Sequence, residues 1–162
     1  MMARLYEVIA RQLPKTATFW LQLKAEEFQH AGMLTELVRE VQLGHAWIAA
    51  ERENTRKITT SLGVIEAQAT RWTKEGVSVR DAFRYALLME NSLVEKEYFV
   101  PLQGDSATVI QTLGAIYAST NNHIKRLREA AARYCRRPWY QRLLDIFDDE
   151  ADDNADFWLT PF

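Results

Sequence analysis

The sequence predicts an all-α protein, built as a four-helix bundle in which a long connection joins the second and third helices. Apolar residues recur at spacings of three and four in four separate segments, which is the periodicity of amphipathic helices. Only six Gly and four Pro interrupt the 162 residues, and few helix breakers favour long helices. The connection, residues 44–77, is too long for a tight hairpin and fits a crossover between helices.

The first helix is expected to be short and the second long. Leu5, Ile9 and Leu13 give a short apolar face that ends before Pro14. The second helix is predicted to start with Thr18 as N-cap and to stop at Gly44. Its inner stripe is expected to contain Trp20, Leu23, Glu27, His30, Leu34, Leu37 and Val41.

The third and fourth helices have clear start signals. Ser78 is a suitable cap for a helix that runs to Val100, before Pro101, and the fourth helix follows a loop at 103–106 and covers about 107–133. The inner stripe of the third is expected to hold Phe83, Ala86, Leu87, Glu90, Val94 and Glu97. That of the fourth is expected to hold Leu113, Ile116, Thr120, His123, Leu127 and Ala130. The crossover itself has helical patches at 47–50 and 58–72.

Two parts of the chain are distinguished by composition. Residues 1–134 are predicted to form the bundle, and residues 135–162 a short C-terminal docking helix followed by an acidic, aromatic tail. Every charged residue from Asp145 to Asp156 is acidic. The block of basic residues before it is interpreted as a solvated helix face.

Composition excludes several classes of function. The formal net charge of −2 gives no electrostatic reason to expect nucleic acid or an anionic membrane surface as a partner. Cys135 is the single cysteine, so no disulfide framework is expected. The chain has no signal-peptide core and no run of about eighteen apolar residues. We therefore expect a soluble, cytoplasmic protein.

A carboxylate and an imidazole fall on the predicted buried stripe of the second helix. Glu27 and His30 are three residues apart and so share one helical face. A buried carboxylate must be neutralised by a proton, a hydrogen-bonded partner or a metal ion. Glu-x-x-His that projects into a four-helix core, with a further Glu from another helix, is the arrangement of di-iron carboxylate bundles. Carboxylate oxygen with imidazole nitrogen suits iron, manganese or zinc.

Three stretches carry a resemblance to a known family. These are FWLQLKAEEFQHAGML (19–34), ALLMENSLVEKEYF (86–99) and STNNHIKRL (119–127). Together they resemble the rubrerythrin branch of the ferritin-like superfamily, in order and spacing over about residues 5–134. The resemblance implies a ferritin-like bundle, a homodimer and a site of two irons. Members of the family reduce peroxide, oxidise ferrous iron or have unassigned roles.

The resemblance assigns metal ligands residue by residue. Glu27 and His30 match the ligands of the second helix, Glu90 matches the glutamate of the third, and His123 matches the histidine of the fourth. Glu97, seven residues after Glu90, is an additional or alternating ligand.

Two positions depart from the family pattern. Thr120 stands where the glutamate of the fourth helix belongs. Tyr6-Glu7 aligns with a pair that follows the ligand of the first helix, which would put that ligand before Met1 unless Glu7 takes its place by a shift in register. The ligand set therefore fits one ion, or an incomplete pair.

Two functional readings remain open. In the first, the protein is a rubrerythrin-like, non-haem metal-binding protein that handles iron or peroxide. No Cys-x-x-Cys is present for a rubredoxin-like centre, so turnover of peroxide would need an external electron donor. In the second, the same fold is a metal-free helical scaffold whose acidic tail engages a partner.

Overall fold

The computed structural model describes residues 1–48, 55–95, 102–103 and 106–135. Over these ranges the protein is all-α, as the sequence predicts. Its helices are α1 (Met2–Gln12), α2 (Ala17–Gln42), α3 (Thr55–Glu75), α4 (Val79–Glu95) and α5 (Ala107–Tyr134), with a 3₁₀ turn, η1 (Pro14–Thr16), between α1 and α2. Two short strands, β1 (Trp47–Ile48) and β2 (Leu102–Gln103), pair antiparallel.

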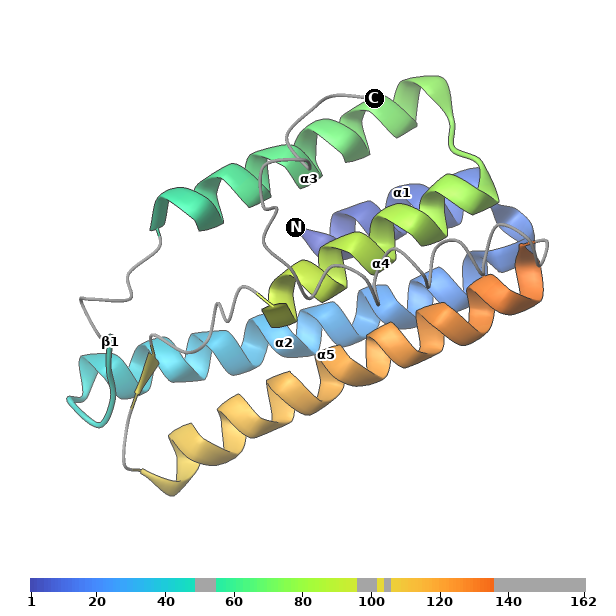
Figure 1. Cartoon of the computed structure of the whole chain (residues 1–162). Helices are drawn as coiled ribbons and strands as arrows, with labels where there is room; N and C mark the ends of the chain where they lie inside the picture. The colour runs from blue at the N-terminus through green and yellow to red at the C-terminus, as the bar shows by residue number, and fades with distance from the viewer. Residues whose placement is uncertain (49–54, 96–101, 104–105, 136–162) are drawn as a thin grey trace.

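The helices lie side by side, and their directions follow from the long connection. α1 packs against α2 and α3, while α5 packs against α4 and α2. In Figure 1, α2 and α4 run in the same direction, and α1 and α5 run in the opposite one. α3 provides the return path, because it runs back along α1 and delivers the chain to the start of α4.

The helix boundaries follow the capping signals with one exception. Ser78 accepts a hydrogen bond from the Asp81 N–H at 3.1 Å, and Ser106 accepts one from the Val109 N–H at 3.2 Å. Gly44 has a left-handed φ of 78°, which permits the sharp end of α2. The prediction of Thr18 as N-cap is wrong, because the helix begins after Thr16. The Thr16 hydroxyl is held at this corner by Trp20 Nε1, which donates to it at 3.0 Å.

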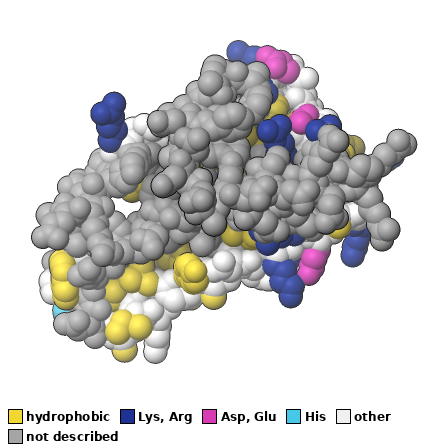
Figure 2. Space-filling model, in the orientation of Figure 1, with side chains coloured by type: hydrophobic (Ala, Val, Ile, Leu, Met, Phe, Trp, Pro, Cys, Tyr) yellow, Lys and Arg dark blue, Asp and Glu magenta, His cyan; other side chains and the backbone are white. Residues whose placement is uncertain are grey.

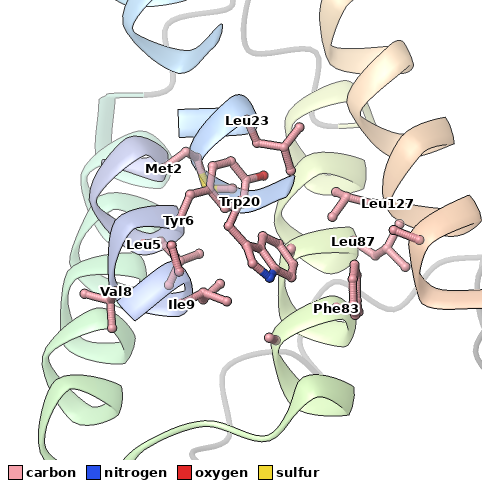
Figure 3. Close-up of a cluster of buried hydrophobic side chains, with 14 of the residues drawn as sticks. Met2, Leu5, Tyr6, Val8, Ile9, Trp20, Leu23, Phe83, Leu87 and Leu127 are labelled. Carbon is pink, nitrogen blue, oxygen red and sulfur yellow. The ribbon is translucent and has the colours of Figure 1, made fainter. Parts of the chain in front are cut away.

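The main core lies where α1, α2, α3, α4 and α5 converge. Trp20 is fully buried at its centre, with ring centroids 5.8 Å from Tyr6 and 4.7 Å from Phe83 (Figure 3). Leu23 of α2 and Leu87 of α4 fill the space beside these rings. A second, smaller cluster around Leu37 and Ile116 joins α2 to α5 farther along.

Two expectations about packing are wrong. Leu34, expected on the inner stripe of α2, is 40% exposed. α1 has only eleven residues and lies beside the first half of α2, so nothing from α1 covers Leu34 (Figure 1). The patch at 47–50 was expected to be helical, but Trp47–Ile48 forms β1, because its backbone pairs with β2.

Hydrophobic side chains gather at the end of the molecule where α2 finishes and α5 begins (Figure 2). Val38, Leu43, Trp47 and Ile110 are among the exposed apolar residues there. The expected docking helix and tail, residues 136–162, lie outside the described residues, as does the end of the third predicted helix. No helix in the described ranges is both long enough and apolar enough to cross a membrane.

Candidate metal centre

Three helices bring four of the predicted ligands into one cluster. Glu27 and His30 come from α2, Glu90 from α4 and His123 from α5. His30 Nδ1 lies 3.1 Å from Glu27 Oε1, and His123 Nδ1 lies 3.4 Å from the same oxygen. His123 Nδ1 is also 3.3 Å from Glu90 Oε1. Glu27, His30 and His123 can thus offer ligand atoms that all lie within 4.8 Å of one another.

The cluster is withdrawn from solvent. Glu90 and His123 are fully buried, His30 is 8% exposed, and the Glu27 side chain is 14% exposed. The packing explains this, because Leu23 and Leu37 flank the pair along α2 and Leu87 precedes Glu90 on α4. Buried carboxylates are costly unless they are compensated, so the balance of charge decides what the cluster can do.

Tyr6 is a site residue that the ligand pattern did not include. It is fully buried in α1, and its hydroxyl donates a hydrogen bond to Glu90 Oε1. Burial, and then the negative charge of Glu90, raises the pKa of Tyr6 well above its ordinary value, so the hydroxyl stays a donor. The Tyr6-Glu7 pair is the sequence signal for this position, and its phenol, not its acid, reaches the cluster.

Glu26 and Arg126 form a second layer behind His123. His123 Nε2 lies 2.8 Å from Glu26 Oε2, while Arg126 Nη1 donates to both oxygens of Glu26 at 2.6 and 2.7 Å. Burial alone would raise the pKa of Glu26, but Arg126 and then His123 bring it below its usual value. This pair directs Nε2 of His123 away from the cluster and leaves Nδ1 facing Glu27 and Glu90.

Of the other predicted positions, neither Glu7 nor Thr120 offers a free ligand atom to these groups. Glu7 does not replace a ligand of the first helix, because it pairs with Lys24 at 3.2 Å and with Arg11 at 2.5 Å. Thr120 is buried beside the cluster, but its hydroxyl donates to the Ile116 carbonyl at 3.0 Å and is committed to its own helix. Glu97 lies outside the described residues.

Acidic groups outnumber basic ones in the cluster. It contains the carboxyl groups of Glu26, Glu27 and Glu90, whereas Arg126 supplies the guanidinium that pairs with Glu26. Burial alone would lower the pKa of His123, yet Glu90 and then Glu27 and Glu26 raise it above its ordinary value. The site therefore attracts positive charge.

The distances between donor atoms separate two ways of compensating that charge. Charge-assisted hydrogen bonds between nitrogen and carboxylate are usually about 2.7–2.9 Å long. The spacings of 3.1, 3.3 and 3.4 Å among Glu27, His30, Glu90 and His123 are longer. Ligands bound about 2.1 Å from a tetrahedral ion lie roughly 3.4 Å apart, which is close to these values. His123 Nδ1 also faces two oxygens but has at most one hydrogen to donate.

Two polar atoms of the cluster are buried without a hydrogen-bond partner among the described residues. They are His30 Nε2 and Glu90 Oε2. An unpartnered buried atom costs stability, and an ion could satisfy Glu90 Oε2 but not His30 Nε2 if His30 binds it through Nδ1. The residues present fit a divalent metal ion through the spacing of their donor atoms.

Comparisons of this chain with models of protein families, with curated proteins and with solved structures found no match.

Proposed function

We propose that this protein is a rubrerythrin-like, non-haem metal-binding protein that holds one divalent ion, iron by preference, between α2, α4 and α5. Glu27, His30 and His123 are the ligands, and Glu90 completes the shell. The observation that carries the proposal is a buried cluster of carboxyl and imidazole groups whose donor atoms are spaced like the ligands of one ion.

The path of the chain supports a ferritin-like fold. α1 and α2 form one pair, α4 and α5 form another, and a long crossover that contains α3 joins them. α2 and α4 consequently run in the same direction (Figure 1). Ferritin-like bundles have one such crossover and build metal sites from side chains on facing helices.

The described residues favour one ion over two. A pair of ions needs several bridging carboxylates to offset its charge. The group that α1 brings to the cluster is the Tyr6 phenol, which is bound to Glu90, and not a carboxylate. On α5 the corresponding position is Thr120, whose hydroxyl bonds its own helix. Glu27 and Glu90 together balance the charge of one divalent ion.

Each protein group has a distinct task in this proposal. Glu26, held by Arg126, fixes the ring of His123 so that Nδ1 faces the ion. Tyr6 orients Glu90 through its hydroxyl and leaves the second carboxylate oxygen free. Leu23, Leu37 and Leu87 keep bulk water from the ligands. A bound iron ion would supply one-electron redox chemistry, and an external donor would have to deliver the electrons.

The second candidate is a metal-free helical scaffold. In this candidate the contacts between Glu27 and the two histidines are hydrogen bonds. His30 and His123 both lie within 3.4 Å of Glu27, which is close enough for such bonds. The two candidates differ in what Glu27 does. In the scaffold it only compensates the imidazoles, whereas in the metal centre it is a ligand.

Metal titration of the chelator-stripped protein tests the proposal. Zinc, and ferrous iron under anaerobic conditions, are titrated into the parent and into Glu27→Gln, which keeps the shape of the side chain and removes its charge. We expect one ion per chain in the parent and at least a 100-fold loss of affinity, on the order of that seen when metal sites lose a supporting group, in the variant.

Glu40→Gln is the matched control. Glu40 also pairs with a histidine, since His45 Nδ1 lies 3.3 Å from Glu40 Oε2, but this pair lies outside the cluster. Its substitution should leave metal affinity unchanged. A parent that binds no ion, or a Glu27→Gln variant that binds as tightly as the parent, would support the scaffold and reject the metal centre.

A further inference from the structure

A continuous row of aromatic rings runs from the cluster to the surface. It begins at Tyr6, whose hydroxyl donates to Glu90 Oε1 and whose ring centroid is 5.8 Å from that of Trp20 in a stacked arrangement. The Phe83 ring lies 4.7 Å from Trp20, and it stacks on Tyr134 at 6.2 Å with 10° between the planes. Figure 3 shows Tyr6, Trp20 and Phe83 in this order. The helices α1, α2, α4 and α5 thus contribute one ring each to this aromatic row.

The two ends of the aromatic row have different surroundings. Tyr6, Trp20 and Phe83 are fully buried, whereas Tyr134 is 46% exposed. Packing of the core requires large apolar rings but does not require a phenol at each end. Tyrosine and tryptophan can give up an electron to a strong oxidant, while phenylalanine resists oxidation, so Phe83 can only bridge its two neighbours. Such a row connects a buried oxidant with a reductant in solution.

A centre with one ion is one electron short for peroxide. Reduction of hydrogen peroxide to two molecules of water takes two electrons and two protons, and a ferrous ion that becomes ferric gives only one electron. Neither Glu7 nor Thr120 offers a free ligand atom for a second ion. The second electron therefore has to come from another group.

We propose that the aromatic row carries this second electron from the surface to the cluster. Its use with peroxide rests on the proposed function, whereas the route itself depends only on the rings. Tyr6 stands at the inner end, where its hydroxyl contacts the Glu90 carboxyl group. Tyr134 stands at the outer end, where a one-electron reductant in solution can reach it.

The transfer balances and leaves one radical at the surface. Tyr6 gives an electron to the half-reduced peroxide and its hydroxyl proton to Glu90 Oε1, which accepts its hydrogen bond. Trp20 then gives an electron to Tyr6, which takes its proton back, and Tyr134 gives one to Trp20. Trp20 keeps its own proton, because Nε1 donates to the Thr16 hydroxyl, which is a poor base. In total, peroxide, a ferrous ion, Tyr134 and one proton from solvent give two molecules of water, a ferric ion and the neutral radical of Tyr134.

Spin trapping, with the adducts located by mass spectrometry, tests the route. Tyr117 is the internal control, because it is 56% exposed and lies about 9 Å along α5 from His123, whereas Tyr134 lies about 16 Å along it. A radical that spreads by proximity or through solvent would label Tyr117 at least as strongly. In a Cys135→Ala background, which removes the neighbouring thiol, ferrous iron with one equivalent of peroxide should label Tyr134 several-fold more than Tyr117.

A second oxidant separates the route from the metal centre. A ruthenium tris-bipyridine label on Glu7→Cys, in the same background without metal, is oxidised by a light flash in the presence of an electron acceptor. The Glu7 side chain is 33% exposed and adjoins Tyr6 in α1, so the label fits at the inner end of the row. Tyr134 should again be labelled more than Tyr117. A protein that binds no ferrous iron but shows this pattern with ruthenium would support the route and reject the metal centre.

Phe83→Leu removes one ring of the row without changing either tyrosine. The ratio of adducts at Tyr134 to adducts at Tyr117 should fall several-fold, and this ratio does not depend on how much iron is bound. Phe28→Leu is the matched control, because Phe28 is 62% exposed and lies outside the row, and it should keep the parent ratio.

A second variant keeps the test valid if Phe83→Leu does not fold. Tyr6→Phe retains the buried ring and removes only the hydroxyl, so it should lower the same ratio with iron and peroxide. A parent that labels Tyr117 as strongly as Tyr134 with both oxidants would overturn the proposal. A folded Phe83→Leu variant that keeps the parent ratio would overturn it as well.

Discussion

Glu26→Gln should weaken metal binding although Glu26 is not a ligand. The carboxylate accepts from His123 Nε2 at 2.8 Å and is itself held by two bonds from Arg126, at 2.6 and 2.7 Å. Gln keeps an oxygen that can accept from Nε2 but loses the charge and the two-pronged bond. Loss of such an outer partner typically lowers metal affinity by about 10- to 100-fold, or roughly 1.4–2.7 kcal/mol.

The effect can be read from unfolding at a buffered concentration of free zinc. At a concentration 100 times the dissociation constant of the parent, zinc stabilises the parent by about 2.7 kcal/mol. At the same free zinc, the variant should gain only about 0.4–1.4 kcal/mol. Without metal the two should differ by less than about 1 kcal/mol, because Arg126 and Glu26 are 25% and 28% exposed and partly screened by water.

Glu66→Gln provides the control for this measurement. Glu66 also pairs with an arginine, Arg4, but on the exposed side of α3, away from the cluster. It should leave zinc affinity unchanged. Equal zinc affinity in Glu26→Gln and the parent would refute the role given to Glu26. A loss of stability that is as large without metal as with it would show that Glu26 serves the fold alone.

Three further predictions follow from the fold and the site. Leu37→Ala should lower the free energy of unfolding in urea by about 2–5 kcal/mol, because Leu37 is only 2% exposed. Leu34→Ala should lower it by less than about 1 kcal/mol, because Leu34 is 40% exposed, and equal losses would contradict this packing. Gly44→Ala should cost about 1–2 kcal/mol, because φ is 78° there, and an unchanged unfolding midpoint would contradict it. Zinc affinity should fall as pH is lowered, by about tenfold per unit for each proton that competes. Because the pKa of His123 is raised, this fall should begin above pH 6.5, and a constant affinity from pH 8 to 6 would contradict it.

Periodicity alone was enough to predict the helices and most of their inner faces. All four expected segments are helical over the residues that the structure describes, and Glu27, His30, Glu90 and His123 lie on the sides that face other helices. The start of α4 at Ser78 and the end of α2 at Gly44 were also predicted correctly, because helix caps depend on local sequence. These features are set by residues a few positions apart.

The errors arose where packing between distant segments decides the outcome. Leu34 belongs to the same periodic stripe as Leu37, and only the short reach of α1 leaves it exposed. Tyr6 and Glu26 enter the cluster because α1 and α5 lie on particular sides of α2, which periodicity within one helix does not specify. The N-cap position of α2 is Thr16 and not Thr18, because the Trp20 side chain donates a hydrogen bond to the Thr16 hydroxyl.

The location of a bound ion tests the central claim most directly. Crystals grown with zinc, measured at the zinc absorption edge, would show the ion as an anomalous difference peak. We expect one strong peak per chain, about 2.0–2.2 Å from a Glu27 oxygen and from ring nitrogens of His30 and His123. A peak only at surface carboxylates, or an ordered cluster of the same side chains without any peak, would contradict the metal centre.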